Sequence, residues 1–395
     1  MLSISGSTCA WTADEVLYLD NAATTRVRPE VREAMLPYLG DRYGNPSSHH
    51  TVGEAAARTL TDARHRVATA LGVRPADVVF TSGGTEADNL AVKGLAIGAA
   101  LRRGIPVHVV TSQIEHEAVL ASCDYLERVH GFAVTRVGVD AAGTIDPDAV
   151  AAAIRPDTAL VSIGYANNEI GTVQDVESLA AVARAAGVPL HLDAVQAAGW
   201  LPLAGTGADA LSLAGHKIGA PQGTGVLAVR ARLPLEPLLH GGGQERDRRS
   251  GTENLAGAVA FATALELAEA ERADAAQRAR SLRDAFVARV LALVPTARLT
   301  GHPTRRLPGT ASFTFSGTSG EAVLLELERR GVVTSSGSAC AAGSDEPSHV
   351  LIACGIGPTT AQTAVRVTLA HDHATPLDAV ADALAASVAA VRSSR

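Results

Sequence analysis

Aromatic residues are scarce in this chain, at 3% of its length, so its hydrophobic core must be built from Ala, Val and Leu. Cysteine is scarce as well. Four scattered cysteines are too few for a disulfide framework, and none of them pair at a metal-ligand spacing; they are Cys9, Cys123, Cys340 and Cys354. This usage predicts a protein of the reducing cytoplasm. We expect no metal site, because His49-His50 and the pair at His371 and His373 lack a third ligand in the pattern.

Segments that would direct the chain to a membrane are missing too. Its first 17 residues have no basic region and no long apolar run, so they do not resemble a secretory signal. No apolar run approaches the length of about 18 residues that a membrane span needs. A net charge of −7 argues against stable nucleic-acid binding. With 47% hydrophobic and 19% charged residues over 395 positions, the composition is typical of a globular protein with one large and one smaller domain.

Short apolar runs alternate with helical stretches over the first two thirds of the chain. Such alternation predicts a mostly parallel sheet that is covered on both faces by helices. The predicted strands are Val78–Thr81, Val107–Ser112, Ala133–Val139, Ala159–Gly164, Pro189–Asp193, Ala210–Leu213 and Gly225–Val229. Only a short turn precedes the last of these, so we expect that strand to be antiparallel. Predicted helices include Thr85–Ala99, His116–Val129 and Val176–Ala186.

The last third of the chain predicts a smaller α+β domain. From Leu255 to Leu293 the pattern is nearly all helical, and we expect two helices there, one leaving the large domain and one opening the small domain. The chain near the N-terminus is expected to return and pack against the small domain. We therefore predict a large domain at residues 28–275 and a small domain at residues 1–27 and 276–395. The predicted small-domain strands and helices are Ala311–Phe315, Thr363–Leu369, Glu321–Arg330 and Pro376–Val391.

Lys217 is the most informative residue. It follows an apolar run and stands between glycines that allow close backbone approach, where a lysine can form an imine with the aldehyde of pyridoxal phosphate (PLP). Taken alone, such a lysine is more often a solvated loop charge. Asp193 ends another apolar run, where a carboxylate can keep the pyridine nitrogen of PLP protonated, although a turn or helix-cap aspartate fits this position equally. Gln196 is a candidate partner for the cofactor's phenolic oxygen.

A glycine turn precedes the helix that we expect to begin near Thr85. The free N–H groups of such a helix start, together with the Thr85 hydroxyl and the close approach that Gly84 allows, can bind a phosphate. This turn, Asp193 and Lys217 each follow a predicted strand. Ligands bind at that edge in open α/β sheets, so the three elements together predict one PLP site.

At this point the chain resembles the class V aminotransferases of PLP-dependent fold type I, and within them the cysteine desulfurases of the nitrogen-fixation and iron–sulfur-assembly group. The resemblance runs from about Tyr18 to the C-terminus, and its most specific part is the run that ends in Cys340. The motifs that carry it are Tyr18–Thr25, Gly44–Ser48, Thr81–Asn89, Glu115-His116, Asn167–Gly171, Asp193–Gln196, Gly215–Lys217, Gly241–Glu245, Arg249–Thr252 and Ser335–Cys340.

This resemblance implies a homodimeric enzyme that converts L-cysteine to L-alanine. Lys217 would hold PLP and later move protons at the substrate's α-carbon, and Cys340 would take up the sulfur as a persulfide. The resemblance further implies a ring-stacking and acid/base role for His116, phosphate contacts from Thr85 and His216, a phosphate contact from Thr252 of the other subunit, and a carboxylate site made by Asn168 and Arg366.

Other interpretations of these residues remain open. A free cysteine such as Cys340 is often a small buried hydrophobe, although a Gly- and Ser-rich loop offers little to bury it. His116 fits a solvent-facing helix start. The charge run Glu245–Arg249 is either solvated or part of the segment that carries Thr252 to a neighbouring subunit. Rival activities are a selenocysteine lyase, an aminotransferase, a kynureninase-like lyase, or a non-catalytic adaptor, which would not need to retain Lys217 and Cys340.

The chain departs from the family pattern at Ala214, where a serine usually contacts the phosphate. Loss of that contact would weaken PLP binding. The chain also ends directly after its last predicted helix, whereas family members that serve iron–sulfur scaffolds often extend further. The sulfur acceptor is therefore open among an iron–sulfur scaffold, a tRNA- or DNA-thiolation system and a sulfur-containing metabolite.

Overall fold

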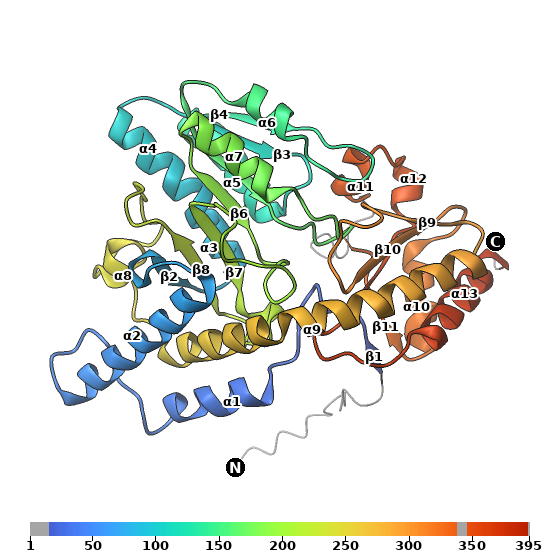
Figure 1. Cartoon of the computed structure of the whole chain (residues 1–395), viewed down its shortest axis with the longest axis horizontal. Coiled ribbons are helices and arrows are strands. Elements are labelled where there is room, and N and C mark those ends of the chain that lie inside the picture. The colour runs from blue at the N-terminus through green and yellow to red at the C-terminus, as the bar shows by residue number, and fades with distance from the viewer. Residues whose placement is uncertain (1–15, 338–345, 394–395) are drawn as a thin grey trace, which may run out of the picture.

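A seven-stranded sheet organises the larger part of the molecule in the computed structural model, which describes residues 16–337 and 346–393 (Figure 1). The strand order is β2-β8-β7-β6-β5-β3-β4, and neighbours run parallel except on both sides of β8. The predicted strands are confirmed to within two residues at each end, including the antiparallel one: β2 (Val78–Thr81), β3 (His108–Ser112), β4 (Ala133–Val137), β5 (Thr158–Gly164), β6 (Leu190–Asp193), β7 (Ala210–Ala214) and β8 (Gly225–Val229).

Helices cover both faces of this sheet, as strands buried on both faces require. Successive strand residues point to opposite faces, so Val109 packs with α5 (Glu117–His130) whereas Val110 belongs to the cluster formed with α2 (Thr51–Leu71) and α7 (Val176–Ala186). The segment Gly84–Arg103 covers the same face as α5. It comprises α3 (Gly84–Asn89), a π-helical turn (Leu90–Gly94) and α4 (Leu95–Arg103).

The larger part of the molecule also contains three shorter helices and the 3-10 helices Leu36–Leu39 and Pro75–Asp77. The three shorter helices are α1 (Pro29–Met35), α6 (Pro147–Ala153) and α8 (Gln244–Asp247). Glycines with positive φ stop the helices that need a sharp end: Gly131 follows α5 at φ 65° and Gly187 follows α7 at φ 68°. These positions agree with the predicted helix ends.

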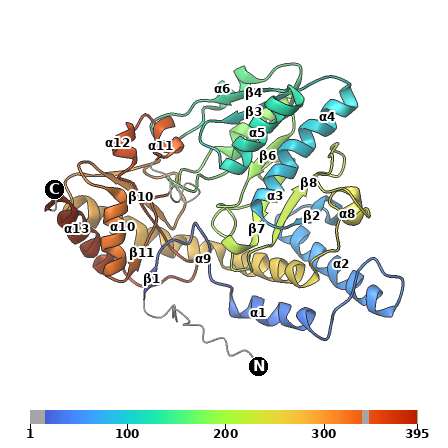
Figure 2. The same ribbon diagram turned by 180° about the vertical axis from the view of Figure 1, so that it is seen from behind.

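The expectation of two helices between Leu255 and Leu293 is wrong. These residues form one helix, α9, of 39 residues, which runs from the large sheet to the smaller one (Figure 2). Its buried residues fall into two groups, from Leu255 to Ala268 and from Ala275 to Val290. The first group packs in the core of the large sheet, and residues of the second group pack in the core of the small sheet. The change in pattern between the groups marks a change of partner, since no Gly or Pro lies between Ala268 and Ala275.

A three-stranded antiparallel sheet in the order β12-β10-β9 organises the smaller part. Its core contains Phe286 of α9 with Phe313 and Phe315 of β10. The N-terminal return is confirmed, because β1 (Leu17–Tyr18) pairs with β11 (Val332–Val333) and Leu19 is fully buried in this core. The remaining elements are β9 (Ala297–Leu299), β10 (Thr310–Phe315), β12 (Val365–Thr368), α10 (Gly320–Arg329), α11 (His349–Ala353), α12 (Pro358–Ala361) and α13 (Asp378–Ser393).

Two hydrophobic clusters thus lie around the large sheet and one around the small sheet, and a fourth joins Ile114 and Ile170 to residues of α11 and α12. The domain limits at residues 28, 275 and 276 stay a prediction. No helix within residues 16–337 and 346–393 is long and apolar enough to cross a membrane.

Candidate active site

A cavity of about 450 Å³ opens where the carboxyl ends of the central strands meet. This is the edge at which the sequence places its candidate residues, and most of them line the cavity. They are Gly84, Thr85, His116, Asn168, Asp193, Gln196, His216, Lys217 and Arg366. Thr252 lines a different cavity, and Cys340 lies outside the described residues.

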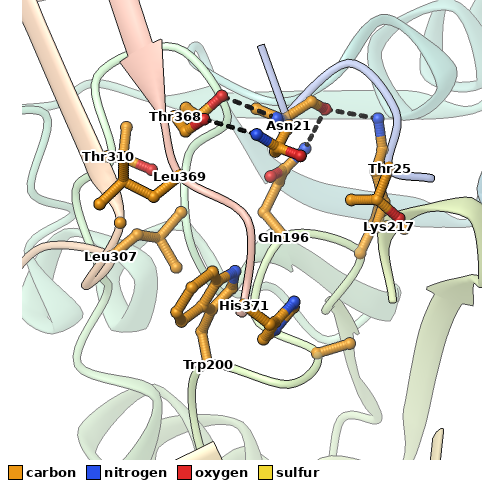
Figure 3. Close-up of a pocket in the computed structure, with 14 residues that line it drawn as sticks. Asn21, Thr25, Gln196, Trp200, Lys217, Leu307, Thr310, Thr368, Leu369 and His371 are labelled. Carbon is orange, nitrogen blue, oxygen red and sulfur yellow. Dashed lines mark hydrogen bonds between the residues drawn. The ribbon is translucent and has the colours of Figure 1, made fainter. Parts of the chain in front are cut away.

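Lys217 ends a single 3-10 turn (Gly215–Lys217) that follows β7 directly. Its Nζ donates to the carbonyl oxygens of Ala22 at 2.5 Å and Ala23 at 2.7 Å. Gln196 Nε2 donates to the same Ala22 oxygen at 3.0 Å, so a segment near the N-terminus meets both side chains (Figure 3). Lysine occurs at only one other position of the chain, Lys93, whose Nζ lies 4.6 Å from the centre of the Tyr125 ring.

Lys217 and Gln196 also line a second, much smaller cavity of about 20 Å³ (Figure 3). Trp200 and His371 stack at its other side with ring centroids 4.0 Å apart. A space of this size holds one water molecule and no cofactor. The candidate cofactor site is therefore the larger cavity.

Asp193 is the last residue of β6, and its Oδ1 accepts a hydrogen bond from Val195 N–H at 2.9 Å. Withdrawal from water raises the pKa of this carboxyl group, and the nearby His116 and Lys217 partly offset the effect. A carboxylate in such a place is stabilised by a cation that lies against it. The protonated ring nitrogen of a pyridine is a cation of this kind, and its N–H can donate a hydrogen bond to the carboxylate.

The candidate phosphate site is a close-fitting cradle. The helix begins at Gly84, one residue before the predicted start, and a Cβ at Gly84 would lie 2.8 Å from Val195 Cγ2 and 3.3 Å from Ala214 Cβ. Only glycine therefore fits here. Ala214, where the family usually has a serine that contacts the phosphate, is 1% exposed and lines the cavity.

His216 stands beside this cradle as a neutral side chain. Burial, followed by the charge of Lys217, lowers the pKa of His216 to about 4. Its Nδ1 lies 3.1 Å from the hydroxyl of Thr24. A neutral imidazole can donate a hydrogen bond to an anion without adding charge, which suits a phosphate contact.

His116 combines two local roles. It is the N-cap of α5, and its Nδ1 accepts a hydrogen bond from Ala118 N–H at 3.1 Å. The same side chain lines the large cavity. The helix start at His116 is thus confirmed, but its side chain is half-buried and lines the cavity.

Glu115 was not a candidate, although it precedes His116 in the chain. It is 3% exposed, lines the cavity, and accepts a hydrogen bond from the Ser112 hydroxyl. Burial raises the pKa of Glu115 to about 7, and the bond from Ser112 opposes this rise. The only signal in the sequence is its position beside His116, since burial of a carboxyl group has no local pattern.

Asp88 of α3 was missed as well. It is 1% exposed, lines the cavity, and its Oδ1 has no hydrogen-bond partner among the described residues. His191 Nε2 lies 3.7 Å from Asp88 Oδ1 and 2.8 Å from Ser212 Oγ. Burial lowers the pKa of His191 to about 3, so this imidazole is neutral, and burial raises the pKa of Asp88 well above its usual range.

Arg366 of β12 enters the cavity from the smaller sheet and is 1% exposed. Its Nη1 donates to the carbonyl oxygens of Asn168 at 2.8 Å and Gly337 at 3.2 Å. Its Nη2 donates to Asp20 Oδ1 at 2.6 Å. Nε has no hydrogen-bond partner among the described residues. A guanidinium has five N–H donors, so these three bonds leave N–H groups, among them Nε–H, for a further acceptor.

The run Glu245–Arg249 is solvated only in part, at Arg246 and Asp247, and it does not line the large cavity. Glu245 is 4% exposed and forms a two-pronged ion pair with Arg64 at 2.6 and 2.7 Å. Arg249 Nε donates to Glu86 Oε1 at 2.9 Å. Thr252 follows this anchored segment and lines a cavity of about 240 Å³ together with Arg249 and Glu245. Within one chain, Thr252 and Lys217 line different cavities.

The two described cysteines are poor nucleophiles. Cys123 and Cys354 are both buried, and burial raises the pKa of Cys123 to about 12 and that of Cys354 to about 11. Cys9, like Cys340, lies outside the described residues. Within residues 16–337 and 346–393, no three metal-ligating side chains gather.

Comparison with known proteins decides the family. The model of the class V aminotransferases matches residues 17–375. A cysteine desulfurase of Cereibacter sphaeroides is 47% identical over 360 residues, which cover 90% of this chain and 91% of that protein. The chain belongs to the class V aminotransferase family, among its cysteine desulfurases. Enzymes of this family use PLP, and the cradle at Gly84, the carboxyl group of Asp193 and the amine of Lys217 fit that cofactor.

Solved structures agree with this assignment. A NifS-like protein superposes with a TM-score of 0.86 at 34% identity, over 96% of this chain and 100% of that chain. SspA in complex with cysteine superposes with a TM-score of 0.78 at 36% identity, over 89% of this chain and 98% of that chain. The cysteine desulfurase fold is thus confirmed, including its seven-stranded, mostly parallel sheet.

Proposed function

We propose that this cysteine desulfurase binds PLP in the large cavity and converts L-cysteine to L-alanine, passing the sulfur to Cys340. The observation that carries the proposal is the meeting of Lys217, Asp193 and Arg366 at one cavity, although they lie in or directly after three different strands of two sheets. Lys217 supplies the amine for the cofactor's aldehyde, Asp193 the counter-charge for its ring nitrogen, and Arg366 the contact for the substrate's carboxylate.

When bound, PLP supplies an electron sink that stabilises negative charge at the substrate's α-carbon. The remaining contacts come from the chain. Gly84, Thr85 and His216 would hold the phosphate group, and His116 would lie against the ring. The Nε2 of Gln196 donates to Ala22 here and would be shared with the phenolic oxygen. A cation beside Asp193 would restore the ionised form of a carboxyl group whose pKa burial raises.

Lys217 would then move the proton at the substrate's α-carbon. Its Nζ can rest on the carbonyl oxygens of Ala22 and Ala23, which stabilise the charged ammonium form after it has taken up that proton. The backbone oxygen of Asn168 accepts a hydrogen bond from Arg366, and both residues line the cavity. The side chain of Asn168 and the guanidinium of Arg366 would therefore bind the substrate's carboxylate together.

Cys340 is the proposed sulfur acceptor within the chain. Gly337, three residues earlier, places its carbonyl oxygen 3.2 Å from Arg366 Nη1. Three residues span at most about 11 Å, so the chain length allows the thiol to reach the cavity. On the other side of residues 338–345, His349 Nε2 lies 3.0 Å from the carbonyl oxygen of Glu115. Described residues on both sides of that segment, Gly337 and His349, therefore contact residues that line the cavity, which supports the assignment.

We further propose a homodimer in which Thr252 of one subunit contacts the phosphate bound by the other. This proposal rests on the separation of Thr252 from Lys217 within one chain and on the ion pairs that fix the preceding segment. The persulfide would pass to a sulfur-acceptor protein in the reducing cytoplasm, with no stable nucleic-acid binding by a chain of net charge −7.

The test is product analysis with purified, PLP-loaded enzyme. In the presence of a thiol reductant, L-cysteine should give L-alanine and sulfide in equal amounts. Lys217→Ala should abolish both products, whereas the control Lys93→Ala should retain them, because Lys93 packs on Tyr125. Formation of pyruvate or of a keto acid in place of L-alanine would contradict the proposal.

A further inference from the structure

Asp20 contacts the arginine of the proposed substrate site directly, in a position that neither the sequence nor the comparisons assign. Its Oδ1 accepts from Arg366 Nη2 at 2.6 Å, and their side chains are 16% and 1% exposed. The two residues are 346 positions apart in the chain. An ion pair this short between a buried guanidinium and a mostly buried carboxylate restricts the orientation of the arginine.

Two of the three side-chain nitrogens of Arg366, Nη1 and Nη2, donate hydrogen bonds to protein atoms. Two backbone carbonyl oxygens hold Nη1, and Asp20 holds Nη2. Nε alone has no partner among the described residues, and Arg366 lines the large cavity. Since the guanidinium is planar, fixing both Nη atoms also fixes the direction of the Nε–H bond.

The backbone around Asp20 is held independently of its side chain. Thr368 N–H donates to Leu19 O at 2.7 Å, and Ala22 N–H donates to the Thr368 hydroxyl at 2.9 Å. Asn21 Nδ2 donates to Thr368 O at 2.9 Å. These contacts surround position 20 on both sides, so a change of the Asp20 side chain should leave the segment in place.

We propose that Asp20 is a positioning residue for substrate recognition: it holds Arg366 so that the guanidinium is oriented to receive the α-carboxylate of L-cysteine. The inference rests on the proposed role of Arg366. Asp20 also brings negative charge near the incoming carboxylate. Its side chain reaches water, which screens that repulsion, whereas the arginine is buried and depends on its partners for orientation. We therefore expect Asp20 to strengthen substrate binding by orienting Arg366 more than it weakens binding by repelling the carboxylate.

The experiment compares Asp20→Ala, which removes the acceptor, with Asp20→Asn, which keeps an acceptor oxygen without the charge. Binding of L-alanine and of ethylamine, which is the same molecule without the carboxylate, is followed in PLP-loaded enzyme by the visible absorbance of the cofactor. Asp20→Ala should weaken L-alanine binding and raise the KM for L-cysteine by about tenfold, the effect of one charge-assisted hydrogen bond. Ethylamine affinity, PLP content and kcat should stay within about threefold of wild type.

Asp20→Asn should restore L-alanine affinity to within about threefold of wild type. The matched control is Asp382→Ala, because Asp382 binds Arg289 at the same 2.6 Å on the exposed surface of the smaller part. It should change none of these values. Unchanged or tighter L-alanine binding by Asp20→Ala, or an equal loss for L-alanine and ethylamine, would overturn the inference.

The variant Arg366→Ala distinguishes a failure of the positioning role of Asp20 from a failure of the proposed role of Arg366. If Arg366→Ala weakens the binding of L-alanine but not of ethylamine, and Asp20→Ala weakens neither, only the positioning role of Asp20 fails. If Arg366→Ala itself leaves the ratio of the two affinities unchanged, the proposed role of Arg366 fails, and the inference with it.

Discussion

The Nζ of Lys217 donates to the carbonyl oxygen of Ala22 at 2.5 Å, across 195 positions of the chain. The segment that carries Ala22 is anchored to Thr368 of the small sheet, and its Asp20 binds Arg366. One short N-terminal segment therefore joins the proposed cofactor lysine and the proposed substrate arginine. This contact explains why the N-terminal return belongs to the active site as well as to the fold.

Lys217 should carry the cofactor. The purified protein should be yellow, and reduction with borohydride followed by peptide mapping should place the pyridoxyl group on Lys217. The chain contains only one other lysine, so the map has a built-in control. A label on Lys93 would overturn the assignment.

Ala214→Ser should tighten PLP binding by up to about tenfold, equivalent to about 1.4 kcal/mol. A serine at this position can donate to the phosphate, whereas Ser212 is already committed, with its Oγ 2.8 Å from His191 Nε2. The rate at saturating PLP should change little, because the phosphate is remote from the bonds that break. PLP dissociation from the two proteins under identical conditions checks this. Equal or faster loss from the serine variant would show that another group already fills the gap.

Glu115→Gln should stabilise the fold above neutral pH. Burial raises the pKa of Glu115 from 4.5 to about 7, so between these values the unfolded chain has lost a proton that the folded chain keeps. Stability therefore falls as the pH rises through this range, by at most about 3 kcal/mol. Glutamine removes the penalty and keeps an acceptor for the Ser112 hydroxyl.

The gain of Glu115→Gln should accordingly be small at pH 5 and largest at pH 8 in denaturant unfolding of the two proteins. Glu33→Gln, which changes an exposed carboxylate of α1, should show no such trend. A gain that does not depend on pH would mean that Glu115 is ionised throughout this range.

Thr252→Ala should weaken PLP binding without unfolding the protein, if Thr252 reaches across a dimer interface. Mixing it with Lys217→Ala should then create heterodimers with one doubly damaged site and one intact site. Activity at limiting PLP should rise above that of either parent. If subunits demonstrably exchange and no activity returns, each site is built from a single chain.

Local patterns were sufficient for most of the fold. Val78–Thr81, Gly225–Val229 and Val176–Ala186 have the predicted bounds, because a buried strand is a short apolar run between turn residues and an amphipathic helix has a strong period. The long helix Leu255–Leu293 was divided wrongly, since its apolar face changes partner part-way along. Periodicity reports which face is buried and not against what it packs.

The candidate site was predictable where a motif carried it, and not where long-range contacts made it. Lys217, Asp193 and Gly84 follow strand ends and could be recognised from that position. The Asp20–Arg366 ion pair and the burial of Glu115 depend on elements far apart in the chain. Neither has a local signal, because the environment of a charged side chain is set only when the two sheets meet.

The fate of the substrate's sulfur tests the account most directly. The enzyme and its Cys340→Ser variant are each loaded with PLP and given one equivalent of L-cysteine without reductant, and their peptides are weighed by mass spectrometry. The account predicts one added sulfur atom on the Cys340 peptide of the wild type, with an equal amount of L-alanine. Cys340→Ser should bind PLP and L-cysteine but form almost no L-alanine, whereas Cys123→Ser and Cys354→Ser should behave as wild type. Desulfuration by Cys340→Ser at the wild-type rate, or sulfur on another cysteine, would contradict the account.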